Sequence, residues 1–280
     1  MEDNKTTYIG DYGATTDTGA VRKENEDTYL ASPESGLWLV ADGMGGHNCG
    51  DVASAITRNT VAERFAAGGK LAGAIQLAHH NILDESKIRR NSSQMGSTIV
   101  AVVVDGVDYE VAWVGDSRAY LWDGQLMQIT QDHSYVRSLV DSGTITPEEA
   151  LTHPSKHLLI RCLGIDDDGR PLQVEIRNGR FSRGQEILLC SDGLTGELGD
   201  EEIEKIIAEK ASAQERADRL VKAAVDNGGK DNVTVILVSA PDCAPVTAGW
   251  KKNTGLVLGG AFLAVFLLGV AFFLKQQGLF

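Results

Sequence analysis

Apolar residues in the first 240 positions alternate between short runs of strand length and spacings typical of helices. Strands are predicted at 37–41, 97–104, 109–114, 118–122, 125–129, 172–177, 186–190 and 233–239. Helices are predicted at 52–66 and 71–82, from Thr146 and Pro147 onward, and at about 200–210 and 213–226. Asp-Gly pairs lie between two sets of consecutive strands and predict hairpins, so we expect antiparallel pairing.

Groups of antiparallel strands therefore alternate with pairs of helices. Two sheets packed face to face, with helices on both outer surfaces, would bury the apolar residues of every strand. The pattern predicts an α+β fold, a four-layer α-β-β-α sandwich of two antiparallel sheets flanked by helices. No internal repeat interrupts residues 1–240, which we take as one domain.

A separate apolar stretch occupies residues 255–274 and contains no charged side chain. As a helix it would be about 30 Å long, which matches the hydrocarbon core of a bilayer. A buried core helix is the alternative, but such a helix normally keeps a polar stripe. We predict one transmembrane helix at 255–274, preceded by a linker at 241–254 and followed by a short tail at 275–280.

Residues beside this stretch predict its orientation. Trp250, Lys251 and Lys252 precede it, whereas only Lys275 follows it. Cytoplasmic flanks of membrane helices carry the excess of Lys and Arg. Because the sequence shows no leading signal peptide, we expect a single-pass membrane protein whose main domain lies on the cytoplasmic side.

Charge narrows the range of partners. The 280 residues carry 26 Lys and Arg against 39 Asp and Glu, a net charge of −13. Residues 1–240 alone hold 23 basic and 38 acidic side chains, a net charge of −15. Such a surface repels polyanions, so we expect no nucleic-acid partner. The cysteines form no CxxC pair, and we expect reduced thiols at Cys49, Cys162, Cys190 and Cys243.

Several acidic residues stand directly beside predicted strands. Asp42 follows the run at 37–41, and Asp192 follows the run at 186–190 after one serine. An Asp-Gly pair usually marks a turn, but these two differ because each comes out of a buried strand. A strand end holds a carboxylate at the edge of a sheet, where several can converge on hard cations such as Mg²⁺ or Mn²⁺.

Five short motifs occur in order along the chain and together resemble one protein family. They are Arg-Lys-Glu-Asn-Glu-Asp at 22–27, Val-Ala-Asp-Gly-Met-Gly-Gly-His at 40–47, Gly-Asp-Ser-Arg at 115–118, Ser-Asp-Gly-Leu at 191–194 and Lys-Asp-Asn-Val-Thr-Val at 230–235. The set is similar to the metal-dependent serine/threonine protein phosphatases of type 2C, in their bacterial form, and the resemblance covers residues 6–240. The family's helix-flanked β-sandwich agrees with the fold predicted from the pattern.

The resemblance implies an all-oxygen site for two Mn²⁺ or Mg²⁺ ions. In such a site Asp42 bridges both ions, the Gly43 carbonyl binds one, and Asp192 and Asp231 bind the other. Few protein ligands leave coordination positions for water. A water shared by two cations loses a proton near neutral pH and becomes the nucleophile.

The resemblance also assigns roles to neighbouring acidic residues. Glu26 is expected to hold water bound to the ions, and Asp27 to support the same layer of contacts. Asp116 resembles the family's ligand for a third, weaker ion that it shares with Asp192. A turn hydrogen bond to Ser117 or the residue after it is the alternative role of Asp116.

Two side chains are expected to act on the substrate. Arg22 would take the phosphoryl group bidentately, although a solvated surface arginine is the alternative. His47 would protonate the leaving seryl or threonyl oxygen, or else cap the following helix. Residues 142–163 match the region that family members use as a mobile flap beside the active site.

The resemblance therefore implies an enzyme that hydrolyses phosphoserine and phosphothreonine in proteins, opposing a serine/threonine kinase at the same membrane. A catalytically silent domain that binds or scaffolds phosphoproteins is the alternative, but it would be expected to lack one of Asp42, Asp192 and Asp231. A hydrolase of another phosphoester is a variant, because the ions do not specify the leaving group. Thiolate and P-loop mechanisms are not supported, since the CysX5Arg and GxxxxGK[ST] motifs are absent.

Overall fold

Two antiparallel sheets form the centre of the structure, a computed structural model that describes residues 8, 10–46, 49–89, 95–165 and 169–245. The five-stranded sheet has the order β1 (Tyr12–Asp17), β11 (Val233–Ser239), β10 (Glu186–Cys190), β7 (Arg118–Trp122) and β8 (Leu126–Gln128). The six-stranded sheet has the order β2 (Asp27–Ser32), β3 (Leu37–Gly45), β5 (Ile99–Asp105), β6 (Asp108–Val114) and β9 (Glu175–Arg180), and β4 (Met95–Ser97) pairs with the end of β3.

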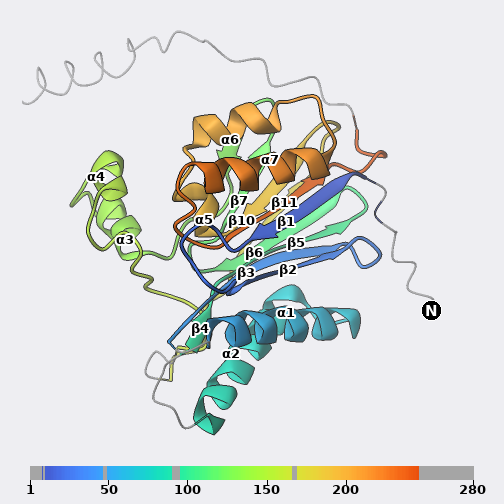
Figure 1. The fold of residues 1–280 in the computed structure, drawn as a ribbon. Coiled ribbons are helices and arrows are strands. Elements are labelled where there is room, and N and C mark those ends of the chain that lie inside the picture. Colours follow the sequence, from blue (N-terminus) through green and yellow to red (C-terminus); the bar gives the residue numbers. More distant parts are fainter. Residues whose placement is uncertain (1–7, 9, 47–48, 90–94, 166–168, 246–280) are drawn as a thin grey trace, which may run out of the picture. The chain divides into compact units, whose positions relative to one another are not determined.

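Helices cover the outer surface of each sheet (Figure 1). Helices α1 (Gly50–Ala66) and α2 (Leu71–Ile88) pack together, and α1 contacts β2 and β3. On the other sheet, α7 (Ala213–Asp226) contacts β1, β11 and α6 (Asp200–Ile207). The predicted four-layer α-β-β-α sandwich is confirmed.

Strand β3 shows why the layers form. Leu37 and Leu39 belong to the apolar core beneath α1 and α2, whereas Trp38 and Val40 belong to the core between the two sheets. Successive side chains of a strand point to opposite faces, so a continuous apolar run supplies both cores at once. The same holds for β11, whose Val235 and Ile236 pack into different cores.

The elements with strong apolar patterns are confirmed. The predicted strands at 118–122, 186–190 and 233–239 have the bounds of β7, β10 and β11, and the predicted helix at 213–226 has those of α7. Thr146 caps α4 (Pro147–Leu151) with its side chain and forms a capping box with Glu149.

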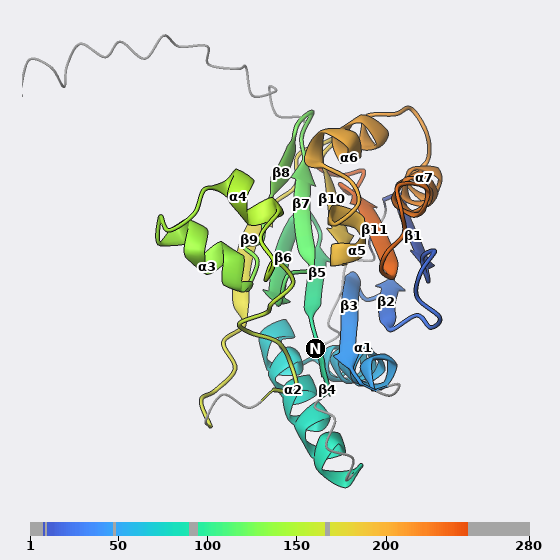
Figure 2. The ribbon, with the colours of Figure 1, turned by 60° about the vertical axis from the view of Figure 1, so that its left-hand side comes forward.

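Other elements were missed or misplaced. Strands β1 and β2 and helices α3 (Tyr135–Asp141) and α5 (Asp192–Thr195) were not predicted. The strand expected at 172–177 lies at β9, and the one expected at 97–104 is interrupted at Thr98 between β4 and β5. Helices α3 and α4 contact each other and lie to one side of the sandwich in Figure 2. The fold therefore contains short polar elements that carry little periodic signal.

The C-terminal predictions lie largely outside the described residues. The boundary of the unit Met1–Val246 falls inside the predicted linker at 241–254, and the predicted transmembrane helix at 255–274 and tail at 275–280 are not described. Within the described ranges, no helix is both long and apolar enough to cross a bilayer. Cys49, Cys162, Cys190 and Cys243 all carry free thiols.

A buried ion pair joins helix α7 to the five-stranded sheet. The two terminal nitrogens of Arg216 donate to the two carboxylate oxygens of Glu186 at 2.6 and 2.7 Å, and both side chains are about nine-tenths buried. Arg216 also donates to the Ile207 carbonyl, and Ser239 donates to Glu186. The pair is thus surrounded by further hydrogen bonds, which offset the cost of removing two charges from water.

Replacing Arg216 by Met should destabilise the fold strongly, because Glu186 would remain buried without its counter-charge. We expect the free energy of unfolding to fall by about 3–5 kcal/mol, measured by urea denaturation. Arg216→Met combined with Glu186→Leu should lose less than the single change, and Lys222→Met, which breaks an exposed pair with Asp226, should change it by less than about 1 kcal/mol. Equal losses in the single and double variants would contradict this account.

Candidate metal and phosphate site

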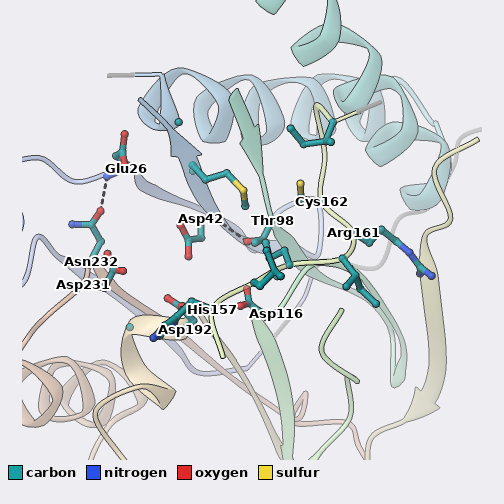
Figure 3. A pocket seen from close by; sticks show the side chains of 18 of the residues that line it. Glu26, Asp42, Thr98, Asp116, His157, Arg161, Cys162, Asp192, Asp231 and Asn232 are labelled. Atoms are coloured by element: carbon teal, nitrogen blue, oxygen red, sulfur yellow. Dashed lines mark hydrogen bonds and ion pairs between the residues drawn. The ribbon is translucent and has the colours of Figure 1, made fainter. Parts of the chain in front are cut away.

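One cavity of about 1180 Å³ brings most of the predicted site residues together. Arg22, Asp42, Gly43, Asp116, Asp192 and Asp231 all line it, as does Glu26. In Figure 3 the carboxylates of Asp42, Asp116 and Asp192 face the same space. His47, the predicted general acid, lies outside the described residues.

Three of these carboxylates come from neighbouring ends of the five-stranded sheet. Asp192 follows β10 as the first residue of α5, and Asp231 lies two residues before β11. Asp116 lies two residues before β7. Because β10 pairs antiparallel with both β11 and β7, the end of β10 lies beside the starts of its two neighbours. Sheet topology therefore gathers residues that are far apart in sequence.

Asp42 comes from the other sheet and lies within β3, not after it. The strand continues to Gly45 because β4 replaces β5 as its partner at this point: Gly43 pairs with Ser97. The Asp42 amide donates to Thr98 Oγ1 at 3.1 Å (Figure 3), and the Thr98 amide donates to the Asp42 carbonyl at 2.8 Å. A side chain at Gly43 would place its Cβ 1.9 Å from the Gly50 carbonyl oxygen, so this position requires glycine.

Burial and the crowding of carboxylates together determine the electrostatics of the site. Burial raises the pKa of Asp42 well above its usual range, and the nearby Asp27 and Asp192 carboxylates raise it further. Burial and Asp192 likewise raise the pKa of Asp116 to about 7. Each negative charge here disfavours ionisation of the others, so a positive charge placed among them would be strongly stabilised.

The donor set suits hard divalent cations. Its oxygens come from carboxylates, the ligands that Mg²⁺ and Mn²⁺ prefer. Within the described ranges, no group of three or more His, Cys, Asp or Glu side chains is already arranged to hold a metal ion. A site of this kind matches cations that keep several waters as ligands, as Mg²⁺ does.

Glu26 and Asp27 have different surroundings. Glu26 Oε1 accepts a hydrogen bond from the Gly50 amide at the start of α1 at 3.2 Å, and burial raises the pKa of Glu26. Asp27 is buried, and its Oδ2 accepts hydrogen bonds from Ser191 and Thr234, both at 2.7 Å. Asp27 begins β2 of one sheet, whereas Ser191 follows β10 and Thr234 lies within β11 of the other, so Asp27 links the two sheets.

Arg22 is about half exposed and pairs with Asp231, with Nη2 2.7 Å from Oδ2. Its loop, residues 18–26, is held against the segment before β11 by Asn232, which sequence reasoning did not single out. The buried Asn232 side chain donates to the carbonyls of Thr18 and Glu24, both at 2.9 Å, and accepts from the Glu26 amide at 2.8 Å (Figure 3). The only indication of this role in the sequence was that Asn232 follows Asp231 within the motif at 230–235.

Residues 156–162, which we call the strap, also line the cavity. His157 Nδ1 lies 3.6 Å from Asp192 Oδ2, a contact that the sequence did not indicate. The strap pairs with the segment that begins at His133: the Ile160 amide donates to the His133 carbonyl at 2.9 Å. His133 in turn accepts a hydrogen bond from the Gly115 amide, next to Asp116, at 3.1 Å.

His133 is neutral in this position. Burial and the nearby Arg161 guanidinium lower its pKa to about 4. Its ring stacks on Trp113, with ring centroids 6.3 Å apart. The predicted flap region at 142–163 thus includes α4 and the whole strap, and the strap is tied to the body of the domain through backbone hydrogen bonds.

Comparisons with known proteins agree with this geometry. The family profile described as protein phosphatase 2C matches residues 20–231. The serine/threonine protein phosphatase PstP of Mycobacterium tuberculosis is 36% identical over 257 residues, which cover 88% of this chain but 49% of PstP. The serine/threonine phosphatase stp of Listeria innocua is 35% identical over 237 residues, 80% of this chain and 93% of that protein.

A solved structure shows the same fold. The catalytic domain of PstP in complex with two manganese ions superposes with a TM-score of 0.73 at 36% identity, covering 84% of this chain and 100% of that domain. The chain spans about half the length of full PstP. Its sheets, its cavity and the matched residues lead to one conclusion: the chain belongs to the protein phosphatase 2C family of serine/threonine phosphatases.

Proposed function

We propose that the chain hydrolyses phosphoserine and phosphothreonine in proteins at a centre that holds two Mn²⁺ or Mg²⁺ ions. The observation that carries this proposal is the convergence of Asp42, Asp192 and Asp231, contributed by both sheets, on one cavity that also contains Arg22. Divalent cations bound there supply Lewis acidity and lower the pKa of water. All three carboxylates are present, which favours an enzyme over a silent phosphoprotein-binding domain.

Different groups of the chain are proposed to bind different ions. The Asp42 carboxylate would contribute to holding both ions, the Gly43 carbonyl would help to hold one, and the Asp192 and Asp231 carboxylates would help to hold the other. Asp116 would help Asp192 to hold a third ion more weakly. The mutual repulsion of these carboxylates supports the assignment, because it is relieved when cations enter.

Arg22 is proposed to bind the phosphoryl group. A guanidinium has five N–H donors, and the pair with Asp231 uses only one terminal nitrogen. The remaining donors can reach phosphoryl oxygens from the cavity wall, where charge builds up in the transition state. Glu26 is proposed to hold ordered water, and His47 to protonate the leaving oxygen.

The chain is also proposed to act at a membrane. The apolar residues 255–274 would anchor it as a single-pass helix with the catalytic domain in the cytoplasm. A phosphatase held there would oppose a serine/threonine kinase at the same membrane, and phosphorylated proteins would be its substrates.

Replacing Asp192 by Asn should abolish metal-dependent turnover. We expect the full chain to release phosphate from a phosphothreonine peptide with Mn²⁺ or Mg²⁺ and to stop in EDTA, and Asp192→Asn to be slower by at least about 100-fold. Asp84→Asn, an exposed change on α2, is the matched control and should keep full activity. A folded protein with no turnover with either ion would instead support the silent binding domain. Hydrolysis of small esters but of no phosphopeptide would support another phosphoester substrate.

Replacing Asn232 by Asp should disturb the Arg22 loop while leaving the shape of the side chain almost unchanged. The new carboxylate cannot donate to the carbonyls of Thr18 and Glu24. We expect kcat/KM for the phosphopeptide to fall by about 10–100-fold, mainly through KM, and the amides of residues 18–26 to exchange faster with solvent.

The control for this change is Asn59→Asp on the exposed face of α1. Mn²⁺ affinity, measured by calorimetry, should fall much less than kcat/KM in Asn232→Asp. An unchanged KM together with unchanged hydrogen exchange would show that Asn232 does not position the loop.

The proposed anchor can be tested by fractionation. The full chain should sediment with membranes and stay there after high-salt and carbonate washes, because a spanning helix is not held by charge. A chain ending at Ala240 should remain in the supernatant. Release of the full chain by carbonate would rule out a spanning helix at 255–274.

A further inference from the structure

Charge is distributed unevenly around the cavity. Its acidic lining residues all come from the body of the domain: Glu26, Asp42, Asp116, Asp192, Glu197 and Asp231. The described lining residues between positions 156 and 173 include Lys156, Arg161 and Arg170 and no Asp or Glu. Among the described residues, one wall is therefore acidic and the other basic; Asp166, Asp167 and Asp168, which belong to the same stretch of sequence as the basic wall, lie outside the described residues.

The acidic wall has its own counter-charges. If the proposed divalent ions bind there, they neutralise Asp42, Asp192 and Asp231. Glu197 is already paired with Lys230, with Lys230 Nζ 3.3 Å from Glu197 Oε1. Lys156 and Arg161 are then described lining residues of this wall whose positive charge can meet a further anion.

Two cations of the basic wall, Lys156 and Arg161, have side chains that reach solvent. Lys156 is exposed, and its Nζ makes no ion pair within the described part of the chain. Arg161 is 28% exposed and donates to Glu175 Oε1 at 3.2 Å, which occupies part of its guanidinium. Figure 3 shows Arg161 on the far side of Asp116 and Cys162 from Asp231, so the cavity extends beyond the carboxylates toward it.

Between these cations lie two apolar side chains of the strap. Leu158 and Ile160 line the cavity and are 54% and 57% exposed. The cavity, about 1180 Å³, exceeds the 300–1,000 Å³ that holds a drug-sized ligand. It therefore has space for residues beside a phosphorylated side chain as well as for the phosphoryl group.

We propose that the strap wall selects phosphoproteins that carry an anionic group next to the phosphorylated residue, with Lys156 and Arg161 as the groups that recognise it. The anion is a carboxylate of Asp or Glu or a second phosphoryl group, and both present oxygens to an ammonium and a guanidinium in the same way. Leu158 and Ile160 contact the apolar part of the same segment. This inference rests on the proposed phosphatase function and names the substrate class for that site.

The test uses the full chain with Mn²⁺ and phosphothreonine peptides that differ only in the residues flanking the phosphothreonine: Glu, Gln, Lys or a second phosphoserine. We expect kcat/KM to be highest for the Glu and phosphoserine peptides and lowest for Lys, with Glu exceeding Lys by about 2–20-fold. The ratio should shrink as salt is raised, because the contacts are partly exposed. A rise for phosphoserine alone would assign the wall to a second phosphoryl group.

Lys156→Glu should lower the Glu-to-Lys ratio of kcat/KM by at least about 2-fold. Because both peptides are measured on the same variant, a general change in turnover cancels in this ratio. The same charge reversal at Lys222, on the exposed face of α7, is the matched control and should leave the ratio unchanged. A ratio at or below one, or one that Lys156→Glu does not move, would overturn the inference while leaving the phosphatase function intact. Absence of all hydrolysis, including that of p-nitrophenyl phosphate, would instead refute the proposed function.

Discussion

Mutual repulsion among buried carboxylates is the constraint on which this structure depends. Burial, and then the nearby acidic groups, raise the pKa values of Asp42 and Asp116. A fold tolerates such crowding only where its backbone is fixed from several sides. Here the backbone is fixed from both sheets. Asp27 at the start of β2 accepts hydrogen bonds from Ser191, which follows β10, and from Thr234 of β11. Because a bound cation would relieve this repulsion, the same crowding favours the binding of cations.

Sequence pattern predicted the elements that bury both faces. Strand β11 reads as a continuous apolar run because it lies between two cores. Strands β1 and β2 escaped prediction because Tyr12–Asp17 and Asp27–Ser32 mix polar residues with few apolar ones. Both are the first strands of their sheets, where one side has no neighbouring strand, so a regular apolar pattern is not required. Helix α5 is a single turn and has no periodic signal at all.

The sequence predicted the site residues that belong to recognisable motifs. It did not predict the contacts that form only when distant segments of the chain come together. Asp192 and Asp231 were expected beside strands and lie there, but the extension of β3 through Asp42 depends on β4, a pairing that no local pattern encodes. Asn232 holds the Arg22 loop by donating to the backbone carbonyls of Thr18 and Glu24. Every residue has such a carbonyl, so the sequence does not show which residues Asn232 will contact. The approach of His157 to Asp192 likewise arises from the path of the strap across the cavity.

The stacking of Trp113 on His133 has a spectroscopic consequence. His133 touches the turn that carries Asp116 through Gly115 and also bonds to the strap at Ile160. An indole in contact with that imidazole reports on its surroundings through its emission. The domain therefore carries an intrinsic fluorophore beside the segment that borders its cavity, whereas Trp38 is sealed between the sheets and Trp122 packs against the core beneath α6 and α7.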